Sequence, residues 1–273
     1  MLLDAMGTLL RLEDPAPRLR EALAGRVGVD VGADAARTAI RAEIGYYRAH
    51  LHQGRDAESL AALRSHCAEA MRPALPDAVA GAPLAELTAA LLDALAFSAY
   101  PDAEPALRQL RSSGCALVVV SNWDCSLHER LEETGLAPLV DGAVASAVVG
   151  AAKPQRAIFD HALALAGAAA KDAWHAGDGV REDVEGARAA GIRAVLIARD
   201  EPLEARDRAA ESSAPAGSSG SSGPSDSSGP SDSSGPSGTS DSAGSEAADV
   251  PVLTSLEGLP ALVAGGGPYA LRP

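Results

Sequence analysis

The 273-residue sequence predicts an α/β fold, with a Rossmann-like parallel sheet as its core and an all-helical cap domain inserted near the N-terminus. Two observations lead to this prediction. From about Tyr100 onward, short apolar runs alternate with helical patterns, which implies right-handed crossovers between parallel strands. Between Pro15 and about Phe97, Leu, Ala and Ile instead recur every three or four residues without strand-like alternation, which predicts about four helices.

The individual elements are expected as follows. An apolar strand starts at Met1 and leads into a loop that ends near Leu10. After the insertion, helices are expected where three- and four-residue periodicity precedes a glycine or follows a proline, at 105–112, 126–134, 155–165 and 183–190. Strands are expected at the continuous apolar runs 115–120, within 143–149, 173–176 and 192–197. A short strand at Val252-Leu253 and a helix around 256–262 are expected to rejoin an edge of the sheet.

These patterns set the domain boundaries. The core is predicted to comprise residues 1–13, 100–200 and 250–264, and the helical cap residues 14–99. Residues 212–247 are nearly all Ser, Gly, Pro, Ala and acidic residues, and Ser-Ser-Gly-Pro-Ser-Asp repeats from 221 and from 227. Because such a segment has few side chains to bury, it is predicted to be a disordered insertion in the core.

Composition excludes several classes of partner. A formal net charge of −14, with no cluster of Lys and Arg, argues against binding to nucleic acid or to an anionic membrane surface. No apolar run approaches the roughly 20 residues of a membrane span. The three cysteines form no Cys-x-x-Cys pair, which indicates reduced thiols in a cytoplasmic protein. We therefore expect a small-molecule substrate; the sequence does not indicate an oligomeric state.

Polar groups follow four of the predicted strands. Asp4 ends the first strand, Gly7 allows a tight turn, and the Thr8 hydroxyl is available to a phosphate or to the backbone. The other groups are Ser121-Asn122, Lys153 before Pro154, and Asp178 with Asp183. Ligands of open α/β sheets bind outside the carboxyl ends of the strands, so these groups are expected to converge on one crevice. A carboxylate placed like Asp4 can act as a nucleophile.

The same groups carry a resemblance to a known family. The order Asp4-x-x-Gly-Thr-Leu, Ser121-Asn122, Lys153-Pro154 and Gly177-Asp178-x₄-Asp183 resembles the four ordered motifs of the haloacid dehalogenase-like hydrolases. The resemblance covers residues 1–199 and 250–263, and the helical insertion resembles the cap that some members carry just after the first motif.

The resemblance implies a role for each residue. Asp4 would be the nucleophile, and Ser121 and Lys153 would assist it and hold the phosphoryl oxygens, together with Thr8 and Asn122 as substrate-binding residues. Mg²⁺ would be held by Asp4, the backbone carbonyl of Met6 and Asp178, with Asp183 acting in the second coordination shell or through water. The expected activity is that of a Mg²⁺-dependent phosphatase, which forms an aspartyl-phosphate on Asp4 from a small phosphorylated metabolite.

Met6 is a departure from the family pattern. Phosphatases of the family carry there a second Asp, which protonates the leaving alcohol and then activates water. Such general acid–base help contributes roughly 10²–10⁴ in rate, so Met6 predicts a slow phosphatase that favours leaving groups of low pKa. A 2-haloacid dehalogenase, which needs no metal and no second Asp, is an alternative; Asp178 counts against it. A catalytically weak or non-catalytic scaffold is a third reading.

Some residues have simpler explanations. Lys153 could be a solvated loop residue, and Asp178 and Asp183 could be charges that favour a helix N-terminus. His175 falls inside a predicted strand and is expected to be a core or sheet-face residue. Cap residues offer candidates for substrate specificity with no recognisable signature, namely Tyr46, Tyr47, His50 and His52.

Overall fold

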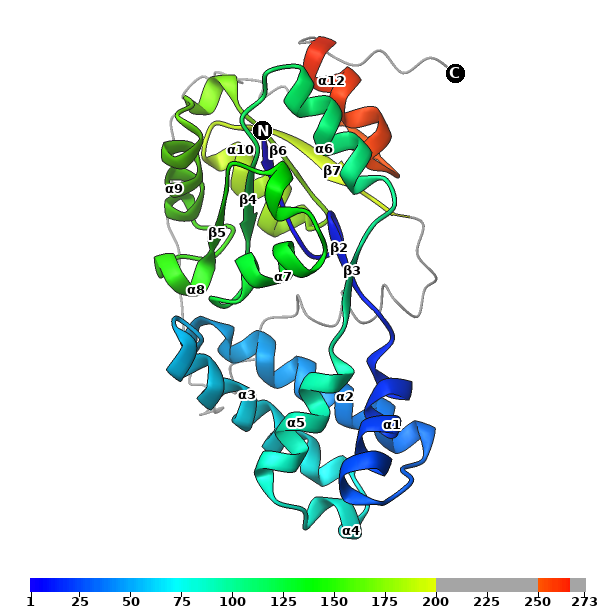
Figure 1. Cartoon of the computed structure of the whole chain (residues 1–273). Helices are drawn as coiled ribbons and strands as arrows, with labels where there is room; N and C mark the ends of the chain where they lie inside the picture. The colour runs from blue at the N-terminus through cyan, green and yellow to red at the C-terminus, as the bar shows by residue number, and fades with distance from the viewer. Residues whose placement is uncertain (200–249, 266–273) are drawn as a thin grey trace, which may run out of the picture.

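The computed structural model describes residues 1–199 and 250–265. They form an α/β core and a helical cap, which a two-stranded ribbon connects (Figure 1). The insertion predicted at 212–247 lies outside the described residues. None of the described helices is both long enough and apolar enough to cross a membrane.

The core contains a six-stranded sheet in which every neighbouring pair of strands is parallel. The strands, in spatial order, are β5 (Gly142–Ala145), β4 (Val118–Ser121), β1 (Leu2–Leu3), β6 (Trp174–Gly177), β7 (Arg193–Ile197) and β8 (Val252–Leu253). The predicted α/β class with a parallel sheet is confirmed, and β8 rejoins the sheet at its edge as expected.

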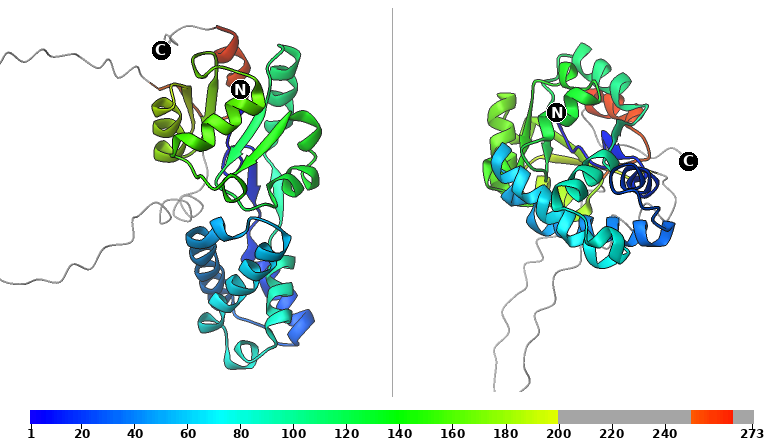
Figure 2. Two further views of the ribbon diagram at one scale, coloured as in Figure 1. Left: turned by 90° about the vertical axis from the view of Figure 1, so that its left-hand side faces the viewer. Right: turned by 60° about the horizontal axis from the view of Figure 1, so that its bottom comes forward.

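Helices cover both faces of this sheet (Figures 1 and 2). Successive strand residues point to opposite faces, so Leu3 and Val119 pack on one side and Leu2 and Val118 on the other. The Leu3 side is covered by α6 (Ala103–Ser112), α7 (Leu127–Glu133) and α12 (Leu259–Gly265). The Leu2 side is covered by α9 (Arg156–Ala166) and α10 (Gly186–Ala189). Because the sheet is buried on both faces, the sequences of its strands are continuous apolar runs.

Short helical segments complete the core. They are α8 (Ser146–Val149), η3 (Ala137–Leu139), η4 (Ala170–Asp172) and η6 (Leu256–Gly258). The helix expected at 183–190 begins earlier, with a π-helical turn η5 (Val180–Glu185) in which the amide of Val184 donates to the Gly179 carbonyl at 3.2 Å. Asp183 consequently lies inside this turn instead of at its start, which matters for its contacts below.

The cap packs around its own apolar cluster. Among the described residues it has five α-helices, where about four were expected: α1 (Pro15–Val27), α2 (Ala33–His50), α3 (Ala57–Met71), α4 (Asp77–Ala80) and α5 (Leu84–Ala94). The extra helix, α4, is a single turn. Two further turns, η1 (Leu51–Gln53) and η2 (Arg72–Ala74), follow α2 and α3. Fully buried Leu19, Leu23, Leu63, Met71 and Leu87 belong to the cluster.

The ribbon between cap and core was not predicted. Strands β2 (Leu10–Leu12) and β3 (Phe97–Ala99) pair antiparallel, with Leu10 opposite Ala99 and Leu12 opposite Phe97. The range 14–99, expected to be helical throughout, therefore ends in a strand. A three-residue strand is too short to display an alternating pattern, which is why periodicity missed both partners.

One buried carboxyl lies in the cap. Glu43 on α2 is 4% exposed. Burial raises its pKa to about 7, although a hydrogen bond with the Cys67 thiol and the charge of Arg48 oppose the shift. The ionised form of Glu43 is therefore costly in the folded cap.

We expect Glu43→Gln to weaken the pH dependence of stability. A carboxyl whose pKa is raised by folding binds its proton more tightly in the folded chain, so the wild type should lose stability as pH rises from 4.5 to about 7. The loss is on the order of 3 kcal/mol. Urea unfolding should show that the free energy of unfolding of the variant, relative to that of the wild type, is higher at pH 8 than at pH 5. The exposed control Glu21→Gln should show no such difference, and equal effects of Glu43→Gln at both pH values would contradict the expectation.

Candidate active site

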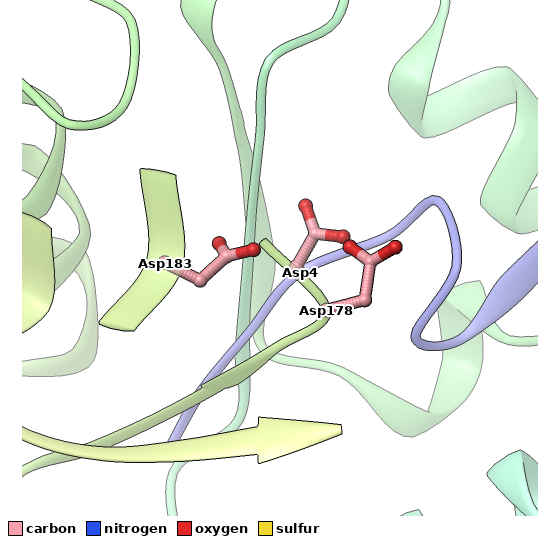
Figure 3. Close-up of side chains that lie close together, drawn as sticks. All are labelled: Asp4, Asp178 and Asp183. Atoms are coloured by element: carbon pink, nitrogen blue, oxygen red, sulfur yellow. The ribbon is translucent and has the colours of Figure 1, made fainter. Parts of the chain in front are cut away.

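Three carboxylates meet at the carboxyl end of the central strands. Asp4 directly follows β1, and its amide donates to the Ala176 carbonyl of the neighbouring β6 at 2.9 Å. Asp178 follows β6, and Asp183 lies one turn later in η5. Figure 3 shows the three side chains close together, and they offer oxygen atoms within 4.8 Å of one another. The convergence expected from the positions of the strands is therefore present in the structure.

Lys153 lies among these acids. Its Nζ is 2.5 Å from Oδ1 of both Asp4 and Asp183, and all three residues are buried. Burial alone would lower the pKa of Lys153, but the charges of Asp183 and Asp4 outweigh burial and raise it. The Ser121 hydroxyl donates to the same Asp4 oxygen at 3.1 Å. The nucleophile candidate thus has one cation and one hydroxyl bound to it.

Asp183 is fixed by three partners. Besides Lys153, its Oδ1 lies 2.8 Å from His175 Nε2, and its Oδ2 accepts from the Gly179 amide at 2.9 Å. Burial opposes ionisation of Asp183, yet Lys153 and the His175 hydrogen bond lower its pKa. His175 is fully buried in β6, as expected of a core histidine, but sequence reasoning missed its contact with Asp183. A histidine in an otherwise apolar strand next to the nucleophile strand was the available signal.

The pKa of Asp178 is shifted in the opposite direction to that of Asp183. Its side chain is open to the cleft, and its pKa is raised to about 8 by loss of surrounding water and by the charges of Asp4 and Asp183. Gly7, with φ of +77°, allows this arrangement, since a Cβ there would overlap the Asp178 carboxylate.

The donor set fits a divalent cation. Lys153 is bonded to only two of the three carboxylates, and burial together with Asp183 raises the pKa of Asp4 against the effect of Lys153. A further positive charge would therefore favour the ionised forms of both Asp4 and Asp178. Carboxylate oxygens are the ligands that Mg²⁺ prefers in proteins.

Two of the residues expected to bind substrate have other surroundings. Asn122 lines the cleft, but its Oδ1 accepts from the Lys153 amide at 2.7 Å and its Nδ2 donates to the Lys153 carbonyl at 3.1 Å. Its amide therefore fixes the backbone of Lys153. Thr8 is fully buried and does not line the cleft, and among the described residues its hydroxyl has no hydrogen-bond partner.

The cleft lies between core and cap. Met6, Asn122 and Trp123 line it from the core. From α2 and α3 of the cap come one glutamate and four arginines, Arg37, Arg41, Arg48 and Arg64. Burial lowers the pKa of Arg48, and the nearby charges of Asp178 and Glu43 partly offset that shift. A chain of net charge −14 therefore presents cationic groups to the cleft from its cap.

The cap is also bonded to the loop after Asn122. The Tyr47 hydroxyl donates to Asp124 Oδ2 at 2.8 Å, and the Cys125 amide donates to the Gly54 carbonyl at 2.8 Å. Burial, and then the charge of Asp124, raises the pKa of Tyr47. Of the four cap residues named as candidates for substrate specificity, Tyr47 lines the cleft. Tyr46, His50 and His52 do not line it, and the rings of Tyr46 and His50 stack with their centroids 4.1 Å apart.

Comparisons with known proteins place the chain among related sequences. A family model described as haloacid dehalogenase-like hydrolase matches residues 1–191. The chain is 39% identical over 140 residues to haloacid dehalogenase-like hydrolase domain-containing protein 3 of Bos taurus, which is 51% of this chain and 55% of that protein. It is 40% identical over 101 residues to phosphoserine phosphatase of Thermus thermophilus, 37% of this chain and 41% of that one. The chain thus spans about half the length of the curated relatives it matches.

A similar fold occurs in a solved structure of L-2-haloacid dehalogenase from Xanthobacter autotrophicus. The TM-score is 0.59, and the match covers 97% of this chain and 98% of that one. Because only 20% of the aligned residues are identical, this likeness shows the fold alone.

We expect Lys153→Met to destabilise the fold strongly. Removing one partner of a buried ion pair leaves uncompensated charge, at a cost of roughly 3–5 kcal/mol. Urea unfolding at pH 7 in EDTA would measure the loss. The exposed control Lys171→Met should change stability by no more than about 0.5 kcal/mol. A loss for Lys153→Met as small as that of the control would show that Asp4 and Asp183 do not depend on this lysine.

Proposed function

Because the chain belongs to the haloacid dehalogenase-like hydrolases, we propose that it is a Mg²⁺-dependent phosphatase acting on a small phosphorylated metabolite. The observation that carries the proposal is the convergence of Asp4, Asp178 and Asp183, two of which, Asp4 and Asp183, are bonded to Lys153. Phosphoryl transfer depends mainly on positioning and charge neutralisation, and this set of residues would provide both with a divalent cation bound.

The proposed roles follow from position. The Asp4 carboxylate, the Met6 backbone carbonyl and Asp178 would hold Mg²⁺, with Asp183 contributing through water or by fixing Lys153. The cation would neutralise charge on the phosphoryl oxygens. Lys153 and Ser121, both next to Asp4, would bind those oxygens. Asn122 would act by holding the Lys153 backbone, and a role of Thr8 would be limited to its backbone.

The chemistry would proceed in two displacements. An Asp4 oxygen attacks the phosphorus, the bond to the ester oxygen breaks, and an aspartyl-phosphate results. Water then attacks that phosphorus, releasing inorganic phosphate and restoring Asp4. Met6 has no proton to give the departing oxygen, and the raised pKa of Lys153 keeps its proton on the lysine. Esters with good leaving groups should therefore react fastest.

Two further observations support an anionic metabolite as substrate. The cap arginines would attract a phosphate to a cleft in an otherwise acidic protein. One relative is named phosphoserine phosphatase, and phosphoserine is a small phosphorylated metabolite. A cytoplasmic location is part of the proposal and rests on three unpaired cysteines.

Dehalogenation is the second candidate, and Met6 is the observation that favours it. A departing halide needs no proton, so Asp4 could displace it from carbon without a neighbouring acid. Asp178 weighs against this candidate, since an additional carboxylate would repel a haloacid carboxylate.

An assay can separate these activities. We expect purified protein to release phosphate from p-nitrophenyl phosphate and acetyl phosphate in Mg²⁺, to lose that activity in EDTA, and to lose it in Asp4→Asn. Chloride release from 2-chloropropionate that persists in EDTA would instead identify a dehalogenase. Inactivity of the folded protein toward all three substrates would favour a non-catalytic member.

Met6→Asp should accelerate reactions with poor leaving groups. General acid–base help contributes about 10²–10⁴ in rate, and the introduced carboxyl could provide it. Turnover of an alkyl phosphate should rise much more than turnover of p-nitrophenyl phosphate, whose leaving group needs little protonation. Met6→Asn, of similar size to Asp but without an acid, is the matched control. An equal effect of both variants on the two substrates would show that protonation does not limit the enzyme.

A further inference from the structure

We propose that Arg199 is a positioning residue for the nucleophile loop, which we define as residues 4–9. Arg199 follows β7 and is far from Asp4 in sequence. Its effect on turnover rests on the proposed phosphatase function, whereas its effect on the loop itself does not. It would act through the backbone of Thr8, and its side chain also borders the cleft.

Contacts with at least three of the described residues hold the Arg199 guanidinium in one place. Nη2 donates to the Thr8 carbonyl at 2.5 Å, and Nη1 lies 3.0 Å from Asp102 Oδ2. The group also lies over the Tyr100 ring, 3.6 Å from its centroid. The side chain is 10% exposed. A planar guanidinium can donate in two directions while stacking on a ring, which the lysine ammonium cannot.

The partners of Arg199 are themselves fixed. Asp102 Oδ2 also accepts from the Leu256 amide at 2.7 Å, which connects it to the segment that returns to the core. Next to the Arg199 contact, the Tyr100 amide donates to the Leu9 carbonyl at 3.0 Å. Two consecutive carbonyls of the loop, those of Thr8 and Leu9, are therefore bound from outside it.

Within the loop, anchoring is otherwise mostly local. The Ala5 carbonyl accepts from the amides of Leu9 and Leu10, each at 2.8 Å, and Gly7 turns at positive φ. The Thr8 hydroxyl is buried and makes no hydrogen bond with a described residue, so it does not secure the turn. The Thr8 carbonyl secures the turn instead, because its hydrogen bond from the Arg199 guanidinium is charge-assisted and therefore stronger than one between neutral groups.

The loop controls the chemistry because it carries two proposed functional groups. Asp4 is its first residue, and the Met6 carbonyl, a proposed Mg²⁺ ligand, lies two residues before Thr8. Displacement of a reacting group by about 1 Å can cost about 10²-fold in rate. Loss of Arg199 should therefore reduce kcat, while substrate affinity, set largely by other elements, changes little.

The test compares Arg199→Ala, Arg199→Lys and the control Arg193→Ala in the full chain. Arg193 begins the same strand, is exposed, and lies over Trp174 at 4.4 Å, so its loss removes a similar cation–ring contact outside the cleft. Hydrogen–deuterium exchange at the Leu9 and Leu10 amides is the first readout, and kcat and KM for p-nitrophenyl phosphate in Mg²⁺ are the second. The third is the Mg²⁺ concentration that half-saturates the shift in melting temperature.

We expect Arg199→Ala to speed exchange at these two amides about tenfold or more relative to the control, since local opening becomes easier. Its kcat should fall about tenfold to a hundredfold with KM within about twofold, and more Mg²⁺ should be needed for half-saturation. Arg199→Lys, the milder variant, should fall between Arg199→Ala and the wild type in amide exchange, in kcat and in the Mg²⁺ concentration needed for half-saturation.

If the wild type releases no phosphate, the phosphatase proposal fails, and amide exchange alone decides the role of Arg199. A lowered melting temperature with unchanged exchange at Leu9 and Leu10 would show that Arg199 is merely structural and would overturn the inference. Unchanged kcat in an active, folded Arg199→Ala would overturn it as well.

Discussion

The ion pairs of Lys153 with Asp4 and Asp183 are the interaction on which the rest of the site depends. Carboxylates brought together at the end of a sheet repel one another, and two of the three are buried. Lys153, bonded to both Asp4 and Asp183, offsets part of this repulsion, while the pKa of Asp178 is raised, so that Asp178 holds its proton more tightly than an ordinary aspartate. Asn122 then matters because it fixes the backbone that delivers the lysine.

This arrangement follows from the parallel sheet. Each pair of neighbouring strands among β4, β1 and β6 is in register, so their carboxyl ends present Ser121, Asp4 and Asp178 side by side. Lys153 and Asp183 come from loops and turns beyond the strands, where small geometric changes matter more. The π-helical turn directs Asp183 back toward Lys153 and His175, an irregularity of the kind often found at functional sites.

Sequence reasoning succeeded where patterns are long or local. Alternating apolar runs and helices located β4, β6, β7 and their helices, and polar groups at strand ends located Asp4, Ser121, Lys153, Asp178 and Asp183. It missed features that depend on distant partners or on two or three residues. The β2–β3 ribbon is too short to show a period, the burial of Thr8 depends on packing, and the contacts of Arg199 with Thr8 and Asp102 join residues that no local pattern relates.

The hydrogen bonds between Tyr47 and Asp124 and between Gly54 and Cys125 lie apart from the ribbon that joins cap and core in sequence. The cap and the core are therefore joined at two separate places, the β2–β3 ribbon and this pair of hydrogen bonds. A hinge motion about the ribbon alone cannot widen the crevice at that rim until the tyrosine hydroxyl leaves its carboxylate and the backbone pair separates. In the proposed phosphatase, a wider opening for substrate on this side would require both of these contacts to break.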